Sequence, residues 1–259
     1  MEKGGMNLKA RLGAGEALFG TFLKTPHPHI VEVLASAGLD CLCIDAEHAP
    51  FDRRDIDACI MAARAGGLPT LVRTPSSAPE QILNALDCGA DGVVVPHIRS
   101  VAEARAVAKA VHYGPGGEGY VARGYAGSSR AAGYGSVAIA DHLAASAQRS
   151  VLVGQIEDVE ALDSIADIAA VEGYDALFIG MIDLTIALGC TSPDDARVVA
   201  ACDHIIAACV TAGRRVGLFT PRASDVPAWR AKGASLFLLG SDHSFVRQGA
   251  RTLRAETGL

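Results

Sequence analysis

The sequence lacks the segments that mark a membrane protein or a nucleic-acid-binding protein. No apolar run reaches the ~18 residues that a membrane-spanning helix needs, and lysine and arginine form no basic run. The formal net charge is -6 at pH 7, which disfavours binding to nucleic acid or to an anionic membrane. The first residues also lack the apolar stretch of a secretion signal. We therefore expect no nucleic-acid partner and no membrane partner.

The cysteines lack the spacing of a disulfide framework or of a zinc site. There are seven of them, an odd number, and none belongs to a C-x-x-C pair. Cys41, Cys43 and Cys88 lie in apolar segments, where a free thiol is usually buried. We expect reduced thiols in a cytoplasmic protein rather than disulfide bonds.

Aromatic residues are also scarce, at 5% of the chain, although hydrophobic residues make up 50% and glycine occurs 28 times. This composition is typical of an α/β protein with a large core. Eight short apolar runs recur along the chain, with helical patterns between them. The runs are residues 17–24, 41–48, 69–75, 91–98, 151–158, 175–184, 215–220 and 235–242.

These runs predict parallel strands covered by helices, because most of them are apolar on both faces. Eight alternating strand and helix units in about 250 residues predict one (β/α)8 barrel, the TIM barrel fold. We expect residues 1–259 to form a single domain with residues 1–12 as a flexible N-terminus. A doubly wound sheet is the alternative fold, but no G-x-G-x-x-G motif follows the first strand.

Residues 113–135 interrupt the pattern, because they are rich in glycine, serine and arginine and read unlike any core helix. A loop of this length in a compact domain is usually functional or disordered. We expect a long loop over one end of the barrel, either a lid or binding loop or a mobile surface loop.

Polar residues stand at the ends of the apolar runs, where a TIM barrel places its active site. Because the strands are parallel, these side chains should converge on one funnel. They are Lys24, Asp45, Glu47, His48, Arg73, His97, Gln155, Glu157, Asp158, Asp183, Thr220, Ser241, Asp242 and His243.

Glu157 and Asp183 end the fifth and sixth predicted strands, which are neighbours in a barrel. Two ionised carboxylates repel each other unless a cation lies between them. Oxygen ligands with open coordination positions suit Mg²⁺ or Mn²⁺. The alternative is a pair of solvated acids at the rim of the barrel.

Arg73 and His48 bring a cation and an imidazole to the same funnel. Arg73 can clamp a carboxylate or stabilise an oxyanion, or it can form an ion pair with Glu47 or Asp45 that only fills the barrel top. His48 can be a general base, a metal ligand or a rim histidine without a chemical role. Lys24 alone among five lysines ends a strand, so a Schiff-base aldolase is a further alternative. The absence of a lysine from the sixth strand disfavours it.

Seven segments follow one another in an order and spacing that is specific as a set. They are IDAEHAPFD (44–52), LVRTP (71–75), LDCGADGVVVPHI (86–98), RGYAGSSRAAGYG (123–135), GQIED (154–158), VEGYDALFIGMIDLT (171–185) and GLFT (217–220). Together they resemble the HpcH/HpaI family of class II, metal-dependent pyruvate aldolases, which includes 4-hydroxy-2-oxoheptanedioate aldolase and 2-dehydro-3-deoxyglucarate aldolase. The resemblance implies a barrel of the phosphoenolpyruvate/pyruvate superfamily type.

The resemblance also implies a set of functional residues. Glu157 and Asp183 match the protein ligands of a divalent metal, either Mg²⁺ or Mn²⁺, with Co²⁺ as a further option. Gln155 matches a residue that contacts the bound oxo acid. The backbone at Ile182 and Asp183 matches the part that holds the acid's carboxylate, at the start of a short helix.

Three further residues match the family's catalytic groups. Arg73 matches the residue that stabilises the enolate, and His48 matches the base. Asp87 matches the acid that orients this base, while Glu47 has only a supporting role.

The implied reaction is the reversible cleavage of a 4-hydroxy-2-oxo acid by an aldehyde-lyase. The products are an aldehyde and pyruvate or a close 2-oxo acid such as hydroxypyruvate, formed through an enolate that the metal and Arg73 stabilise. An oxaloacetate decarboxylase that uses the same enolate is the alternative. A CoA-ester lyase is disfavoured because no basic nucleotide-binding patch is visible. A non-catalytic binding homologue is disfavoured because Arg73, Glu157, Asp183 and His48 are all present.

Asp87 poses a geometric problem, because a helix that runs back from a barrel strand ends near the opposite face. Within one subunit Asp87 should therefore lie far from His48. We expect a neighbouring subunit to supply Asp87, in a homo-oligomer with shared active sites. The resemblance implies a hexamer.

The chain departs from the family pattern near the expected carboxylate site. Where the family has Gly-Pro-(Ala or Ser)-Asp-Leu-Ser, this chain has Gly180-Met181-Ile182-Asp183-Leu184-Thr185. The bulkier Ile182 should alter the pocket around the 2-oxo acid and therefore the donor preference.

Overall fold

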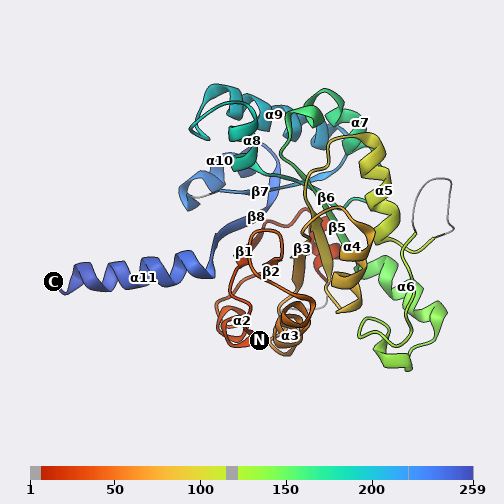
Figure 1. The fold of residues 1–259 in the computed structure, drawn as a ribbon. Helices are drawn as coiled ribbons and strands as arrows, with labels where there is room; N and C mark the ends of the chain where they lie inside the picture. Colours follow the sequence, from red (N-terminus) through yellow and green to blue (C-terminus); the bar gives the residue numbers. More distant parts are fainter. Residues whose placement is uncertain (1–6, 115–121, 221, 259) are drawn as a thin grey trace.

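Eight parallel strands close into a barrel, so the predicted TIM barrel is confirmed. The computed structural model describes residues 7–114, 122–220 and 222–258, and all eight strands lie within them. Each strand pairs with the next, and β8 pairs with β1 to close the ring (Figure 1). The strands are β1 (Leu18–Leu23), β2 (Cys41–Asp45), β3 (Thr70–Arg73), β4 (Gly92–Val95), β5 (Val151–Ile156), β6 (Ala176–Ile179), β7 (Arg215–Phe219) and β8 (Ala234–Ser241).

Helices connect the strands and pack around the outside of the barrel (Figure 1). Capping residues help to set where they begin: Asp52 and Ser100 accept backbone hydrogen bonds at the starts of α3 and α5. The helices between strands are α2 (Pro28–Ala35), α3 (Arg53–Ala65), α4 (Pro79–Asp87), α5 (Val101–Val111), α6 (Ile139–Arg149), α7 (Ile165–Ala169), α8 (Met181–Ala187), α9 (Ala196–Thr211) and α10 (Val226–Ala231). Two further helices, α1 (Leu8–Gly13) and α11 (Asp242–Glu256), precede β1 and follow β8.

Alternate residues of a strand belong to two separate cores. In β2, Cys41 and Cys43 pack in the smaller cluster inside the barrel, whereas Leu42 and Ile44 pack in the cluster that includes the helices. Both faces of β2 are therefore buried, as are most positions of the other strands, which is why the strands read as continuous apolar runs. Charged side chains gather where β2 and β3 end, and there the register places Asp45 beside Arg73.

The N-terminal helix α1 packs against the interior of the barrel. Leu8 and Leu12 are buried in the same cluster as the inward-facing strand residues, and Lys9 forms an ion pair with Asp175 at 2.9 Å. The sequence predicts a flexible segment over residues 1–12. Residues 1–6 lie outside the described residues, and the rest of that segment is ordered by this apolar contact.

The segment 113–135, predicted to be a long loop over one end of the barrel, packs beside α3 and α4. Residues 115–121 lie outside the described residues. In the described part, Arg130 binds Asp57 of α3 through two nitrogens, at 3.2 and 2.7 Å. The backbone N–H of Ala131 donates to the carbonyl of Asp87 at the end of α4. Arg123 is buried, and its guanidinium lies 4.3 Å from the ring centre of Tyr113.

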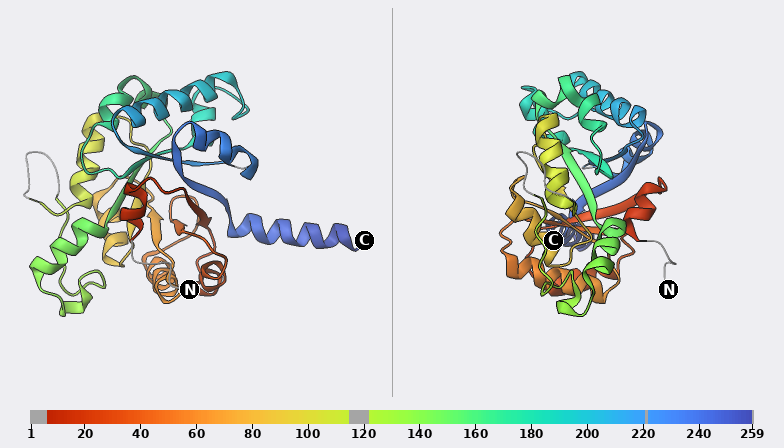
Figure 2. Two further views of the ribbon diagram at one scale, coloured as in Figure 1. Left: turned by 180° about the vertical axis from the view of Figure 1, so that it is seen from behind. Right: turned by 90° about the vertical axis from the view of Figure 1, so that its right-hand side faces the viewer.

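The last helix, α11, leaves the barrel instead of packing back onto it (Figures 1 and 2). Its first residue, Asp242, is buried and accepts the backbone N–H groups of Lys24 and Thr25. Beyond that residue the helix exposes large apolar side chains, among them Val246 and Leu253. Among the described residues, no helix combines the length and apolar character needed to cross a membrane.

Candidate active site

A pocket of about 350 Å³ opens at the carboxyl ends of the strands. It collects five of the residues that the family resemblance marks as functional, namely His48, Arg73, Gln155, Ile182 and Asp183. Its other lining residues are Phe22, Lys24, Phe178, Gly180, Met181, Phe219, Gly240, Ser241 and Ser244. The pocket therefore combines an apolar wall with a small number of charged and polar groups, as small-molecule sites usually do.

Glu157 lies directly against this pocket. It is only 2% exposed, and Gln155 donates a short hydrogen bond to its Oε2 atom. A Cβ atom added to Gly180 would lie 2.5 Å from that same oxygen, so only glycine leaves room for the carboxylate here. Gln155 Oε1 is buried and has no hydrogen-bond partner among the described residues. An unpaired buried oxygen next to a buried carboxylate suits a bound cation or a bound ligand.

Arg73 is held by a buried carboxylate. Its Nε and Nη2 atoms lie 3.0 and 2.8 Å from Asp45 Oδ1, and its Nε lies 3.3 Å from Glu47 Oε2. Its guanidinium also lies 4.6 Å from the ring centre of Phe22. The sequence gives Arg73 two alternative roles, an ion pair that fills the barrel top and a charge in the active site. Arg73 meets both descriptions, because it pairs with Asp45 and Glu47 and also lines the pocket.

Asp45 is the electrostatic anchor of this group, and it forms the ion pair with Arg73 that the sequence left open as an alternative. It is fully buried and also binds Lys24 Nζ at 3.0 Å and the backbone N–H of His48 at 3.1 Å. Burial alone would raise its pKa, but the charges of Arg73 and Lys24 outweigh burial and hold the pKa below its ordinary value. Asp45 is therefore a charged partner, and the pairing of Lys24 with it gives no support to a Schiff-base role.

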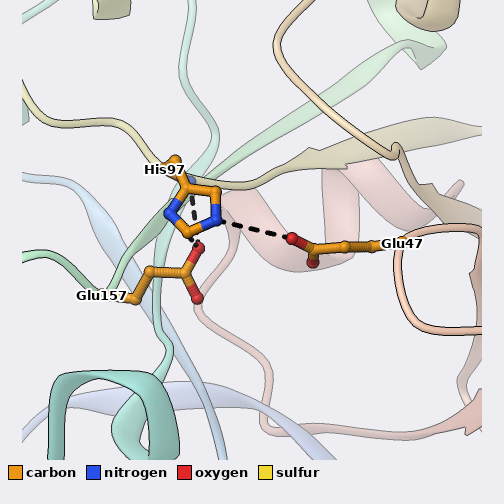
Figure 3. A group of neighbouring side chains, drawn as sticks. All are labelled: Glu47, His97 and Glu157. Atoms are coloured by element: carbon orange, nitrogen blue, oxygen red, sulfur yellow. Dashed lines mark hydrogen bonds and ion pairs between the residues drawn. The ribbon is translucent and has the colours of Figure 1, made fainter. Parts of the chain in front are cut away.

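Glu47, His97 and Glu157 form a second group at the ends of β2, β4 and β5 (Figure 3). One potential ligand atom from each residue lies within 4.8 Å of the others, a spacing that could accommodate a metal ion. His97 Nε2 lies 3.7 Å from Glu47 Oε1, and His97 Nδ1 lies 3.4 Å from Glu157 Oε1. Burial raises the pKa of Glu47, and the nearby charge of Glu157 adds to the effect, while Arg73 opposes it.

This grouping differs from the metal pair expected from the sequence. Glu157 belongs to it, whereas Asp183, in the first turn of α8, lines the pocket but does not fall within this group of described residues. The sequence places His97 only among the polar residues at the strand ends. Its backbone adopts φ of 57°, a left-handed conformation that is uncommon for residues other than glycine, and the sequence carries no clear signal for it.

Asp87 lies elsewhere in the subunit, as its position at the end of α4 predicts. It lines a different pocket with Arg53, Asp57 and Arg130, whereas His48 lines the pocket at the strand ends. Asp87 Oδ1 is buried without a hydrogen-bond partner among the described residues, and burial raises the pKa of the carboxyl. The Oδ1 atom of Asp87 can therefore still form a hydrogen bond with another group.

Comparisons with known proteins agree with this fold. The family model described as HpcH/HpaI aldolase/citrate lyase matches residues 18–248. A hydroxypyruvate/pyruvate aldolase from Roseovarius nubinhibens is 33% identical over 249 residues, covering 96% of this chain and 95% of that protein. A 5-keto-4-deoxy-D-glucarate aldolase from Shigella dysenteriae is 32% identical over 249 residues, covering 95% and 94%.

A solved structure extends the likeness to three dimensions. The crystal structure of an HpcH/HpaI aldolase/citrate lyase family protein from Burkholderia cenocepacia superposes with a TM-score of 0.90 at 32% identity. That match covers 97% of this chain and 99% of the other. The family match, the similar aldolases and the shared fold each span nearly the whole chain. The chain therefore belongs to the HpcH/HpaI aldolase/citrate lyase family and is an aldolase of the class II pyruvate type.

Proposed function

We propose that this aldolase reversibly cleaves a 4-hydroxy-2-oxo acid into an aldehyde and either pyruvate or hydroxypyruvate. The observation that carries the proposal is the single pocket that presents Arg73, His48, Gln155 and Asp183 together, with Glu157 against its wall. The relatives named hydroxypyruvate/pyruvate aldolase support the choice of donor. The contact of Ile182 with the pocket makes its side chain the first candidate for setting donor preference.

The residues present fit a divalent metal. We assign its ligands to Glu157 and Asp183, and the buried, unpaired Gln155 Oε1 is a further oxygen acceptor in the same site. When bound, a Mg²⁺, Mn²⁺ or Co²⁺ ion would act as a Lewis acid that polarises the keto oxygen of the 2-oxo acid. Gln155 orients the acid through its amide, and the first turn of α8 at Ile182 and Asp183 borders its carboxylate.

Arg73 supplies the fixed positive charge in this mechanism. Its guanidinium, held in place by Asp45, stabilises the oxygen on which negative charge develops as the C3 proton leaves or as the carbon–carbon bond breaks. Because Asp45 and Phe22 already fix the guanidinium, no reorganisation is needed at the moment of reaction.

His48 moves the protons in this mechanism. Its side chain is half exposed at the mouth of the pocket, and its Nε2 lies 3.8 Å from Glu47 Oε2. In the cleavage direction it removes the proton of the 4-hydroxyl group, and the enolate formed when the carbon–carbon bond breaks then takes up a proton at C3 to give the 2-oxo acid. In the reverse direction a proton leaves C3 and the aldehyde oxygen takes up a proton.

We further propose a homo-oligomer, a hexamer by family resemblance, in which Asp87 of one subunit serves His48 of another as a positioning residue. The buried and unpaired Oδ1 of Asp87 supports this arrangement, as does its place outside the pocket that contains His48. The exposed apolar side chains of α11 support association between copies of the chain. We propose the cytoplasm as the location, since all seven cysteines are buried free thiols.

The experiment that tests the proposal is exchange of the C3 protons of pyruvate in D₂O, followed by NMR. We expect exchange with added Mg²⁺ or Mn²⁺ and its loss in EDTA and in Glu157→Ala. Glu160→Ala, which removes an exposed acid three residues further on, is the matched control and should keep the exchange. Exchange that persists in EDTA would contradict the metal-dependent mechanism. Oxaloacetate decarboxylation faster than any aldol cleavage would favour the decarboxylase alternative.

A further inference from the structure

We propose that His97 supplies a nitrogen ligand, through Nε2, to the divalent cation beside Glu157, and that Glu47 completes this side of the site. A cation site with an imidazole nitrogen favours Co²⁺ or Mn²⁺ over Mg²⁺, so His97 would set the metal preference of the enzyme. The inference rests on the proposed function, because it presumes that a divalent cation binds at Glu157.

The positions of the three side chains are the first support. The imidazole of His97 lies between the two carboxylates, with Nε2 3.7 Å from Glu47 Oε1 (Figure 3). That separation is too long for a hydrogen bond but is suitable for two ligand atoms that share one cation. Glu157, 2% exposed, faces the same ring. Two carboxylates around one imidazole form a mixed nitrogen and oxygen ligand set.

The second support is a carboxylate behind the imidazole. Asp158 Oδ2 lies 3.0 Å from His97 Nδ1. A carboxylate can only accept this hydrogen bond, so Nδ1 carries the proton, and in the neutral ring the lone pair is on Nε2. Histidines that bind metals usually donate their other ring N–H to a carboxylate in this way, because the contact orients the ring and makes it a better ligand.

The backbone of His97 gives the third support. Its φ of 57° is costly for a residue other than glycine, and such strain persists where the surroundings hold it. Here the backbone N–H of His97 donates to Glu157 Oε1 at 3.0 Å. The same residue thus touches Glu157 through its backbone and Glu47 through its ring. The strained turn brings the imidazole to the two carboxylates, and another backbone conformation would direct the ring elsewhere.

The chemistry of the ligands then predicts the preference among metals. Mg²⁺ is a hard cation that takes oxygen ligands and retains its waters. Imidazole nitrogen suits first-row transition metals, whose affinities rise from Mn²⁺ to Co²⁺ and Ni²⁺. Removal of the nitrogen should therefore weaken Co²⁺ binding much more than Mg²⁺ binding.

The test uses the full-length protein and measures metal binding rather than turnover. Pulsed EPR of bound Mn²⁺ detects coupling to a ¹⁴N nucleus when an imidazole is a ligand. We expect this coupling in the unmodified protein and its loss in His97→Asn, because asparagine tolerates left-handed backbone and has no ring nitrogen. His48→Asn and the surface variant His204→Gln should both keep the coupling.

Dissociation constants from calorimetry provide an independent readout. In His97→Asn the dissociation constant for Co²⁺ should rise about tenfold or more, the scale on which ligand-shell changes act, and that for Mg²⁺ should rise less than about threefold. In Asp158→Asn the coupling should persist while Co²⁺ affinity falls by an intermediate factor. If His97→Asn does not fold, Asp158→Asn decides, and unchanged Co²⁺ affinity there rejects the arrangement.

The outcomes separate this inference from the proposed function. Coupling that is absent from the unmodified protein, or that survives in His97→Asn, overturns the role of His97. Equal losses of Co²⁺ and Mg²⁺ affinity would overturn it as well, since they indicate a general disturbance of the site. If pyruvate exchange still requires metal and Glu157 in such a case, the proposed function stands alone. If no divalent cation binds at all, both are rejected.

Discussion

Asp45 and Arg73 form a buried ion pair at the top of the barrel, in which two guanidinium nitrogens lie 3.0 and 2.8 Å from one carboxylate oxygen. The two residues are register partners on adjacent strands, so the sheet itself sets their spacing. Lys24 binds the other carboxylate oxygen at 3.0 Å. Asp45 belongs to a strand of the barrel, and it holds in place the guanidinium charge of Arg73 that the proposed reaction uses.

Replacing Asp45 with asparagine should reduce both stability and activity. The change removes the carboxylate charge that Lys24 and the buried Arg73 share and leaves Arg73 with the contact to Glu47, and breaking a buried pair typically costs about 3–5 kcal/mol. Activity should fall by about 10²-fold because Arg73 loses its fixed orientation. The matched control is Asp194→Asn, which removes an exposed partner of Arg222 and should cost less than about 1 kcal/mol. Urea denaturation and turnover of both variants provide the measurement.

The difference in stability between the unmodified protein and Asp45→Asn should depend on pH, because the pKa of Asp45 is lowered in the folded protein. The folded state binds this proton less tightly than the unfolded chain does, so the carboxylate stabilises the fold above its unfolded pKa. The stabilisation disappears as the pH falls through the lower, folded pKa. The stability gap between unmodified protein and Asp45→Asn should therefore be constant near neutral pH and should narrow in acid. A gap that widens in acid would contradict this account.

Glu47→Gln should stabilise the metal-free protein at neutral pH while weakening metal binding. The pKa of Glu47 is raised, first by burial and then by the charge of Glu157, so its ionised form is disfavoured in the folded state. The folded state therefore binds the proton of Glu47 more tightly than the unfolded chain does. Ionised Glu47 lowers the stability of the fold above the folded pKa, and this loss of stability vanishes below the unfolded pKa. Melting curves in EDTA should show a gain near neutral pH that shrinks toward pH 4 or so. A loss of stability at neutral pH would show that the contact with Arg73 outweighs burial.

Gly180→Ala should disrupt the site through a single methyl group. The added carbon would lie 2.5 Å from Glu157 Oε2 and 2.7 Å from Glu157 Cβ, so the whole side chain has to shift. Metal affinity should fall about tenfold or more, and pyruvate exchange should fall with it. Gly249→Ala in α11 is the control, because nothing lies within 4 Å of the added atom. That change should leave metal affinity unchanged and stabilise the helix by up to about 1 kcal/mol.

A mixture of two inactive variants tests whether subunits share active sites. His48→Asn and Asp87→Asn oligomers should each have low activity, because one lacks the base and the other lacks the residue that orients it. If Asp87 acts on a neighbouring subunit, hybrids formed by subunit exchange contain some sites with both residues and should regain activity. Light scattering should confirm the oligomer before and after mixing. A mixture with no more activity than its components would reject the shared site.

The barrel and most of the pocket could be predicted from the residues alone. Eight apolar runs specify eight buried parallel strands, because only strands covered on both faces lack a polar side. Their ends must meet at one face, which explains why His48, Arg73, Gln155 and Asp183 line one pocket although they lie far apart in the sequence. The same reasoning predicts that Asp87 lies far from His48 within one subunit, since a returning helix ends at the opposite face of the barrel.

Other features depend on the tertiary structure. The sequence alone determined that the chain forms a TIM barrel and which polar residues stand at the strand ends, because hydrophobic periodicity is a local signal. Only the folded chain decided that Asp45 anchors Arg73, that His97 turns through a left-handed conformation toward Glu47 and Glu157, and that α11 leaves its own barrel. These outcomes depend on loop backbone conformation and on contacts between residues far apart in the sequence, and hydrophobic periodicity encodes neither of them.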